Sequence, residues 1–193
     1  MAKDINSIMA GWVDRGPWQY WDSLNIAALA VMASTYNMFA VPIGQVDPVT
    51  AAVRTKLQTN MQRGNQFPPP RCLVLMQIGF YLGSEMLKGD IDNLLNGAYF
   101  EFRIDEKIFF EGHLWQAPAG TGLVGHSTVA GESHYTLGVA SPGATRRYGP
   151  FAKYIAPLQQ FSMTLVLPGT PPTLTEALNL VVFLDGLTDR AVQ

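Results

Sequence analysis

The sequence predicts an all-β protein, a single antiparallel β-sandwich or jelly roll with one or two short helices. About eight runs of strand length occur along the chain, and proline and glycine separate them. These runs do not alternate regularly with helical segments, as they would in a parallel α/β sheet. One run also alternates apolar and polar residues with the period of two that is typical of a half-buried strand. Together these observations favour a two-sheet sandwich.

The clearest element is a hairpin over residues 99–113. Its first strand places apolar and charged residues on opposite faces: Phe100, Phe102 and Ile104 against Glu101 and Arg103. The chain is predicted to turn back at residues 105–106. This alternation indicates an antiparallel strand with one face in the core.

The other predicted strands are longer apolar runs between breakers. They cover residues 71–82, 151–155, 159–167 and 178–187. The first of them follows three prolines at 68–70, which supply no backbone donors, so a strand begins only after them. We expect residues 71–82 to form a central strand.

Helical character is predicted in one place and left open in another. Residues 84–95 predict a short helix, with Ser84 as its capping residue and apolar side chains at helical spacing. Residues 24–32 fit either a short helix or a strand, because periodicity alone does not separate the two. The connection over 47–65 is expected to be helical or irregular.

The 193 residues suit one domain. We expect residues 1–34 to be an amino-terminal arm or peripheral segment and residues 35–193 to be a single jelly-roll domain. A Gly-rich excursion over 117–149 interrupts that domain, and a loop of this length usually serves binding or assembly. Four aromatic side chains near the start could dock on the domain's own core, which we favour, or on a neighbouring subunit: Trp12, Trp18, Tyr20 and Trp21.

The composition indicates a surface with few charges. Hydrophobic residues make up 48% of the chain and charged residues 15%, against about 25% in typical soluble domains. Such a surface predicts oligomerisation, and the alternative is a monomer coated with small polar residues. The net charge of -2 argues against general nucleic-acid binding. We expect the adjacent arginines 146–147 to be solvated or interface residues.

Redox and targeting features are few. Cys72 is the only cysteine, so the chain has no intramolecular disulfide, and an apolar run predicts that this thiol packs in the core. The first residues lack the pattern of a secretory leader, which predicts a protein made and folded in a cytoplasm. The apolar stretch over 26–41 is interrupted by polar residues and falls short of the ~20 apolar residues that a spanning helix needs.

The three histidines are candidates for a metal site. His113, His126 and His134 are spaced too widely to supply the His-x-His pair of a cupin, although Glu111 and Glu132 lie nearby in the sequence. Two of the histidines fall in the Gly-rich span, where a rigid set of ligands is hard to maintain. We therefore predict no metal site.

Other catalytic motifs are absent or weak. The serines in 125–134 do not match a nucleophile elbow, and the carboxylates of the 99–113 hairpin are expected to be solvated. The glycines of 120–125 resemble a dinucleotide fingerprint, but no βαβ unit accompanies them. We predict no catalytic, cofactor-binding or metal-binding residues, no cofactor and no enzymatic activity.

Three segments together suggest a family. The first segment is Thr-Asn-Met at 59–61, followed by Gln-Phe-Pro-Pro-Pro at 66–70 and a long apolar strand. The second is residues 151–157, which lead into 161–168, and the third is a closing strand over 181–193. In these segments the chain resembles the jelly-roll capsid proteins of tailless icosahedral bacteriophages and related viruses. The resemblance covers residues 35–193 in layout.

The resemblance implies a capsid subunit that self-assembles into an icosahedral shell. Its partners would be copies of itself and other virion proteins, and its location the virion after synthesis in the host cytoplasm. Residues 12–21 would be an arm, and residues 26–41 could face an internal membrane where the virus has one. We keep two alternatives open. One is a cupin-type enzyme using His113, Glu111 and a second histidine. The other is a carbohydrate-binding sandwich using Trp115, Tyr135 or Tyr148.

Overall fold

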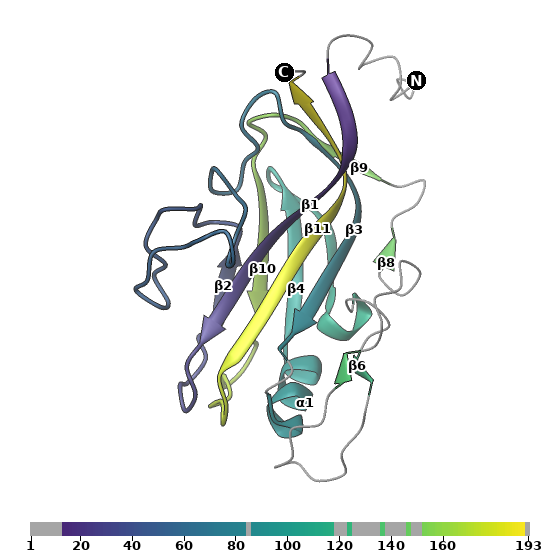
Figure 1. Ribbon diagram of the computed structural model, residues 1–193. Helices are drawn as coiled ribbons and strands as arrows, with labels where there is room; N and C mark the ends of the chain where they lie inside the picture. The colour runs from purple at the N-terminus through teal and green to yellow at the C-terminus, as the bar shows by residue number, and fades with distance from the viewer. Residues whose placement is uncertain are drawn as a thin grey trace.

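The computed structural model describes residues 13–83, 86–117, 123–124, 136–137, 146–147 and 152–191. Two antiparallel sheets pack face to face, and one helix lies at an end of the sandwich (Figure 1). The predicted fold class, an all-β antiparallel sandwich with few helices, is therefore confirmed.

The strands divide between two main sheets and a small ribbon. The first sheet contains β1 (Val13–Ile26), β11 (Leu178–Ala191) and β3 (Leu73–Leu82), with β8 (Arg146–Arg147) and β9 (Lys153–Ile155) both paired with β3. The second sheet contains, in order, β2 (Thr35–Met38), β10 (Phe161–Val166), β4 (Tyr99–Ile104) and β5 (Lys107–His113). The ribbon joins β6 (Leu123–Val124) to β7 (Thr136–Leu137).

The pairing pattern is that of a jelly roll. The first strand pairs with the last, β1 with β11, and the next pairs inward are β2 with β10, β3 with β9, and β4 with β5. The chain thus forms a nested set of antiparallel pairs. Lateral pairing of β11 with β3 and of β10 with β4 joins these pairs into the two sheets. This wrapping is the double Greek key of jelly rolls.

The first strand lies where the sequence analysis placed an arm. Residues 13–26 pair with β11 along their whole length, from Val13 opposite Ala191 to Ile26 opposite Leu178. This part of the 1–34 segment is therefore a strand of the first sheet, and residues 1–12 lie outside the described residues. The ambiguous run over 24–32 ends β1 as a strand and continues as a turn and loop. Tyr20 is buried in the domain's own core.

Aromatic side chains from both sheets fill the core. Phe67, from the proline-rich segment before β3, stacks on Phe161 of β10 with ring centroids 4.9 Å apart and lies 4.5 Å from Tyr20 of β1. Nearer the helix, Phe80 of β3 meets Phe100 of β4 at 4.5 Å. Each such buried side chain contributes roughly 1.5–3 kcal/mol through removal of apolar surface from water. The core thus ties the two sheets together at both ends.

The predicted hairpin is confirmed in detail. In β4 buried and half-buried positions alternate, with Phe100, Phe102 and Ile104 buried. The turn follows at 105–106, where Asp105 takes a left-handed conformation with φ of 54°. Asp and Asn tolerate that region better than most residues do.

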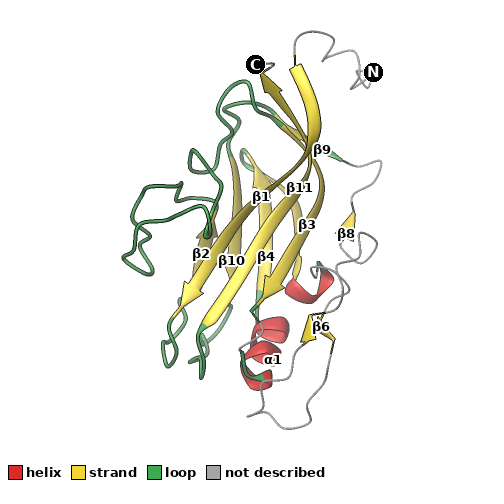
Figure 2. Cartoon of the chain, viewed as in Figure 1, coloured by secondary structure: helices red, strands yellow, loops and turns green. Residues whose placement is uncertain are grey.

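The helix begins later than predicted. Helix α1 spans Lys88–Gly97 and is drawn in red at the lower end of the sandwich in Figure 2. Its cap residue Leu87 makes no side-chain capping bond. Ser84, the predicted cap, lies outside the described residues. The segment over 47–65 contains no helix, and a short 3-10 turn at Leu114–Gln116 follows β5. Among the described residues, no helix is both long and apolar enough to cross a bilayer.

Candidate interaction surface

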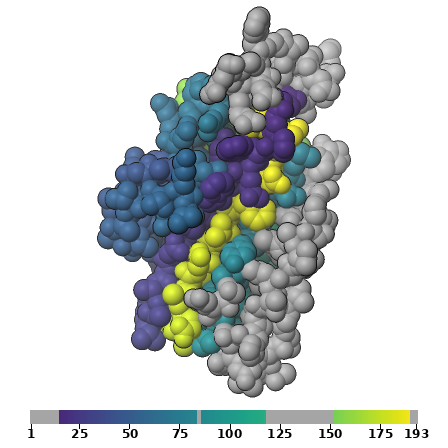
Figure 3. All heavy atoms as spheres, viewed as in Figure 1, coloured from purple at the N-terminus to yellow at the C-terminus, as the bar shows by residue number. Residues whose placement is uncertain are grey.

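The connection between β2 and β3 stands out beside β1 as a lobe on the side of the sandwich (Figure 3). Residues 44–54 of this connection form a small hairpin, which we call the lateral hairpin. Val46 and Val53 make an antiparallel bridge across it. Backbone hydrogen bonds join Asp47 N to Ala52 O at 2.8 Å and Arg54 N to Gln45 O at 2.9 Å.

The local sequence explains the turn of this hairpin. Asp47 precedes Pro48, and its Oδ1 accepts a hydrogen bond from Val49 N at 2.7 Å, as aspartate does in turns. Ala51 completes the turn in a left-handed conformation, with φ of 55°. The turn is therefore closed by its own side chain and backbone.

The two faces of the lateral hairpin reverse the usual polarity. Val46 and Val53 are 60% and 56% exposed, whereas the adjacent Asp47 and Arg54 are 3% and 7% exposed. Because successive strand residues point to opposite faces, the valine pair faces solvent and the charged pair faces the sandwich. A soluble protein normally buries the apolar face and exposes the charged one. Exposed apolar side chains on an ordered element are one of the features that mark interaction sites.

Two more apolar side chains of the same connection are exposed. Val49 at the hairpin turn is 46% exposed, and Leu57 in the following turn is 89% exposed. The turn that carries Leu57 is closed by Gln58 N and Thr59 N, which both donate to Thr55 O at 3.1 Å. We call Val46, Val49, Val53 and Leu57 the apolar face. It is presented by backbone that is hydrogen-bonded in place.

A buried ion cluster fixes the hairpin to β1. The guanidinium of Arg54 pairs with Asp22 Oδ1 on β1, and its Nη2 lies 2.7 Å from Asp47 Oδ2. The second oxygen of Asp22 accepts a hydrogen bond from Phe39 N at 2.6 Å. One cation thus connects two carboxylates that come from different parts of the chain.

In this cluster two buried carboxylates share one buried cation. Burial raises the pKa of Asp22 to about 6, although the Arg54 charge and the Phe39 N–H lower it in part. Asp22 is only 1% exposed, so water does little to offset its charge. The single Arg54 charge is also shared with Asp47. The cluster therefore orients the hairpin at an energetic cost.

Side chains beyond the cluster seal the free edge of β1. Asn60 Oδ1 accepts from Trp21 N at 3.0 Å, and Asn60 Nδ2 donates to Gln19 O at 2.8 Å. Thr59 Oγ1 donates to Trp21 O at 3.2 Å, and Trp21 Nε1 donates to Lys56 O at 3.2 Å. These contacts occupy strand groups that an edge would leave open. Thr59 and Asn60 belong to the Thr-Asn-Met segment noted in the sequence.

Of the predicted metal candidates, the structure describes His113 and Glu111. Both are exposed on β5, and His113 Nδ1 lies 3.3 Å from Ala98 O. No three His, Cys, Asp or Glu side chains gather as a metal site within the described part of the chain. His126, His134 and Glu132 lie outside the described residues.

Of the other residues singled out from the sequence, some are described by the structure and some lie outside the described residues. Trp115 is 55% exposed, and its ring lies parallel to that of His113 at 6.1 Å between centroids. Tyr135 and Tyr148 lie outside the described residues, as does most of the 117–149 excursion. Cys72 is buried, as predicted, and its thiol donates to Asp189 Oδ2 at 3.3 Å. Burial raises the pKa of this thiol.

Sequence reasoning missed the apolar face, because it treated residues 47–65 only as a connection. A signal was present in the spacing of Val46, Val49, Val53 and Leu57, which recur every three to four residues as on one face of a helix, although the segment forms a hairpin and a turn instead. Period alone could not show that the charged residues between them would be buried instead.

No family model matches this chain, and neither a curated protein nor a solved structure matches it.

Proposed function

We propose that this protein is a capsid subunit, a structural virion protein whose copies assemble into an icosahedral shell. The lateral hairpin carries the proposal: its apolar side faces solvent while its charged side is buried. An ordered apolar surface of this kind is stabilised when a partner covers it. The proposed partner is a neighbouring copy of this chain, and other virion proteins would make further contacts.

The fold and the composition support the same function. Jelly rolls serve as capsid domains, but they also serve as lectins and cupins, so the fold alone does not choose among these classes. The choice of a capsid subunit rests on the exposed apolar face and the low charge of the chain. With charged residues at only 15% of the chain, few charges oppose close approach of identical copies. A stable contact between copies needs about 1,000 Å² of buried surface in total, and a preformed apolar face loses little entropy on binding.

The test measures particle mass. Tag-free protein is followed by light scattering over a range of salt and protein concentrations, and large species are imaged by negative stain. Closed shells or defined rings of subunits are expected. The informative variant is Val46→Thr with Val53→Thr, which keeps side-chain volume but makes the apolar face polar. It should shift the protein toward monomer with no more than about 0.5 kcal/mol of change in monomer stability.

A matched control is Val31→Thr, the same change at a 68% exposed valine outside the lateral hairpin. It should assemble as the wild type does. Wild-type protein that stays monomeric under all conditions would contradict self-assembly. Assembly that survives the double substitution would contradict the role of the lateral hairpin.

A further inference from the structure

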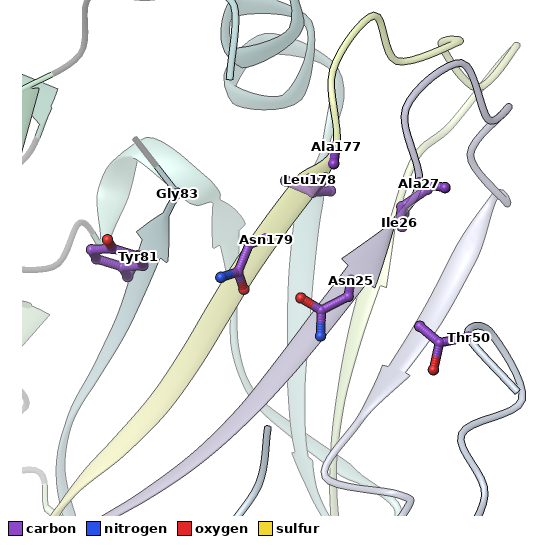
Figure 4. A pocket seen from close by; sticks show the side chains of 9 residues that line it. All are labelled: Asn25, Ile26, Ala27, Thr50, Tyr81, Gly83, Ala177, Leu178 and Asn179. Carbon is purple, nitrogen blue, oxygen red and sulfur yellow. The ribbon is translucent and has the colours of Figure 1, made fainter. Parts of the chain in front are cut away.

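A groove crosses the outer surface of the first sheet near the start of β11 (Figure 4). Its volume is about 480 Å³, and it is lined by Asn25, Ile26, Ala27, Thr50, Tyr81, Gly83, Ala177, Leu178 and Asn179. A smaller hollow of about 160 Å³ adjoins it and shares Asn25 and Thr50 with it. The groove thus runs from β3 across β11 and β1 to the lateral hairpin.

Two asparagines form its floor. Asn25 of β1 and Asn179 of β11 are register partners, so their side chains lie side by side on one face of the sheet. Asparagine is a poor strand residue, and a cross-strand pair of them contributes little to sheet stability. Asn25 Nδ2 donates a weak bond to Ser23 Oγ at 3.3 Å. Asn179 is exposed, and its side-chain amide faces the groove (Figure 4).

The neighbouring strand leaves room beside this pair. Gly83 follows β3, and its N–H donates to Asn179 O at 2.8 Å. Since Gly83 has no side chain, the space next to Asn179 stays open. Tyr81, two residues earlier, is half-buried and places its ring at one end of the groove, while Thr50 of the lateral hairpin stands at the other (Figure 4).

We propose that this groove binds a neutral saccharide. Amides both donate and accept, so the Asn25 and Asn179 pair can bridge adjacent sugar hydroxyls, and the Thr50 hydroxyl can add a further bond. The Tyr81 ring offers an apolar surface with a polar tip to the carbon face of a sugar ring. The nine lining residues carry no charge, which disfavours phosphates and acidic sugars. A volume of this size fits one or two sugar rings, within the range of small-molecule sites.

The test uses ligand-observed saturation-transfer NMR on the full chain. The probes are glucose, galactose, mannose and N-acetylglucosamine, with N-acetylneuraminic acid as the acidic comparator. We expect at least one neutral sugar to bind with a Kd of roughly 1–10 mM, as a shallow open site allows, and the acidic sugar not to bind. Asn179→Ala should weaken binding about tenfold, and Tyr81→Ala should abolish it.

The matched control is Asn37→Ala, at an exposed strand asparagine of the second sheet. It should bind sugar as the wild type does, and thermal melting should show that all variants fold. The proposal is overturned if no neutral sugar binds, or if binding is unchanged in both Asn179→Ala and Tyr81→Ala. Repeating the titration on the Val46→Thr, Val53→Thr protein separates this result from assembly, because neither valine lines the groove.

Discussion

Arg54 is a single buried cation that holds two buried carboxylates, and its contacts decide which way a whole hairpin faces. Removing one partner of a buried ion pair leaves uncompensated charge, which costs far more than the intact pair contributes. At the residue scale, the stability of the lateral hairpin therefore depends on Arg54 more than on its exposed valines.

Replacing Arg54 with Ala should lower the free energy of unfolding by about 3–5 kcal/mol, because Asp22 and Asp47 are then buried without a cation. Urea denaturation measures the loss. Limited trypsin digestion should also show faster cleavage after Lys56 as the hairpin loosens. Lys56→Ala, at an exposed neighbour, should change stability by less than about 0.5 kcal/mol. Equal stability of both variants would contradict a structural role for the ion cluster.

Asp22 gives the cluster a pH dependence of defined sign. Burial raises the pKa of this carboxyl from 3.8, the ordinary value for aspartate, to about 6 in the folded protein, so the folded state holds the proton more tightly. Asp22 therefore lowers stability as the pH rises from about 4 to about 6, by about 3 kcal/mol in all. Asp22→Asn removes this titration. The difference in unfolding free energy between wild type and Asp22→Asn should change by that amount across the window, and a constant difference would contradict the assignment.

At the scale of elements, the buried carboxylate of Asp90 anchors helix α1 to the chain that leads into β11. Asp90 accepts hydrogen bonds from Thr175 N at 2.8 Å, Thr175 Oγ1 at 3.3 Å and Glu176 N at 3.2 Å. These donors belong to the connection that leads into β11. Ile91 and Leu94 add apolar contact with the core. The helix thus closes one end of the sandwich.

Asp90→Ala should lower the free energy of unfolding by about 1–3 kcal/mol, because three hydrogen bonds to a buried carboxylate are lost. Asp92→Ala is the comparison on the same helix: Asp92 pairs with Lys88 and its side chain is 41% exposed, so its loss should cost no more than about 0.5 kcal/mol. Thermal melting of the two variants measures the difference. Equal melting temperatures would show that α1 does not depend on the Asp90 contacts.

At the scale of the whole molecule, the jelly-roll wrapping pairs strands that lie far apart in the sequence. Val13 lies opposite Ala191, and the ends of β1 and β11 lie together at one end of the sandwich (Figure 1). The loop-closure entropy of these pairings must be offset before the core forms. The whole chain is therefore needed to complete the first sheet.

Refolding should consequently occur in milliseconds to seconds, as in other domains dominated by non-local strand pairing. Two of the four tryptophans, Trp18 and Trp21, lie in β1, so stopped-flow fluorescence of a Trp12→Phe, Trp115→Phe protein reports when this strand joins the sheet. Microsecond refolding would contradict formation of the β1 and β11 pair as part of the limiting step.

The fold class and the elements with a local pattern follow from the amino-acid sequence alone. The 99–113 hairpin, the strand within 71–82 and the last strand were predictable because apolar period and breakers act over a few residues. The burial of Cys72 followed from the same local pattern. The predicted capsid function remains a proposal.

Features that depend on partners distant in the sequence are visible only in the folded chain. Residues 13–26 became a strand because β11 pairs with them, and no local period announced that pairing. The polarity of the lateral hairpin was decided by Asp22, far away in the sequence, which holds Arg54 inward and leaves Val46 and Val53 exposed. Asn25 and Asn179 became neighbours through the same strand pairing. A side chain's role in this protein depends on which strand lies beside it, and the wrapping of the whole chain decides that.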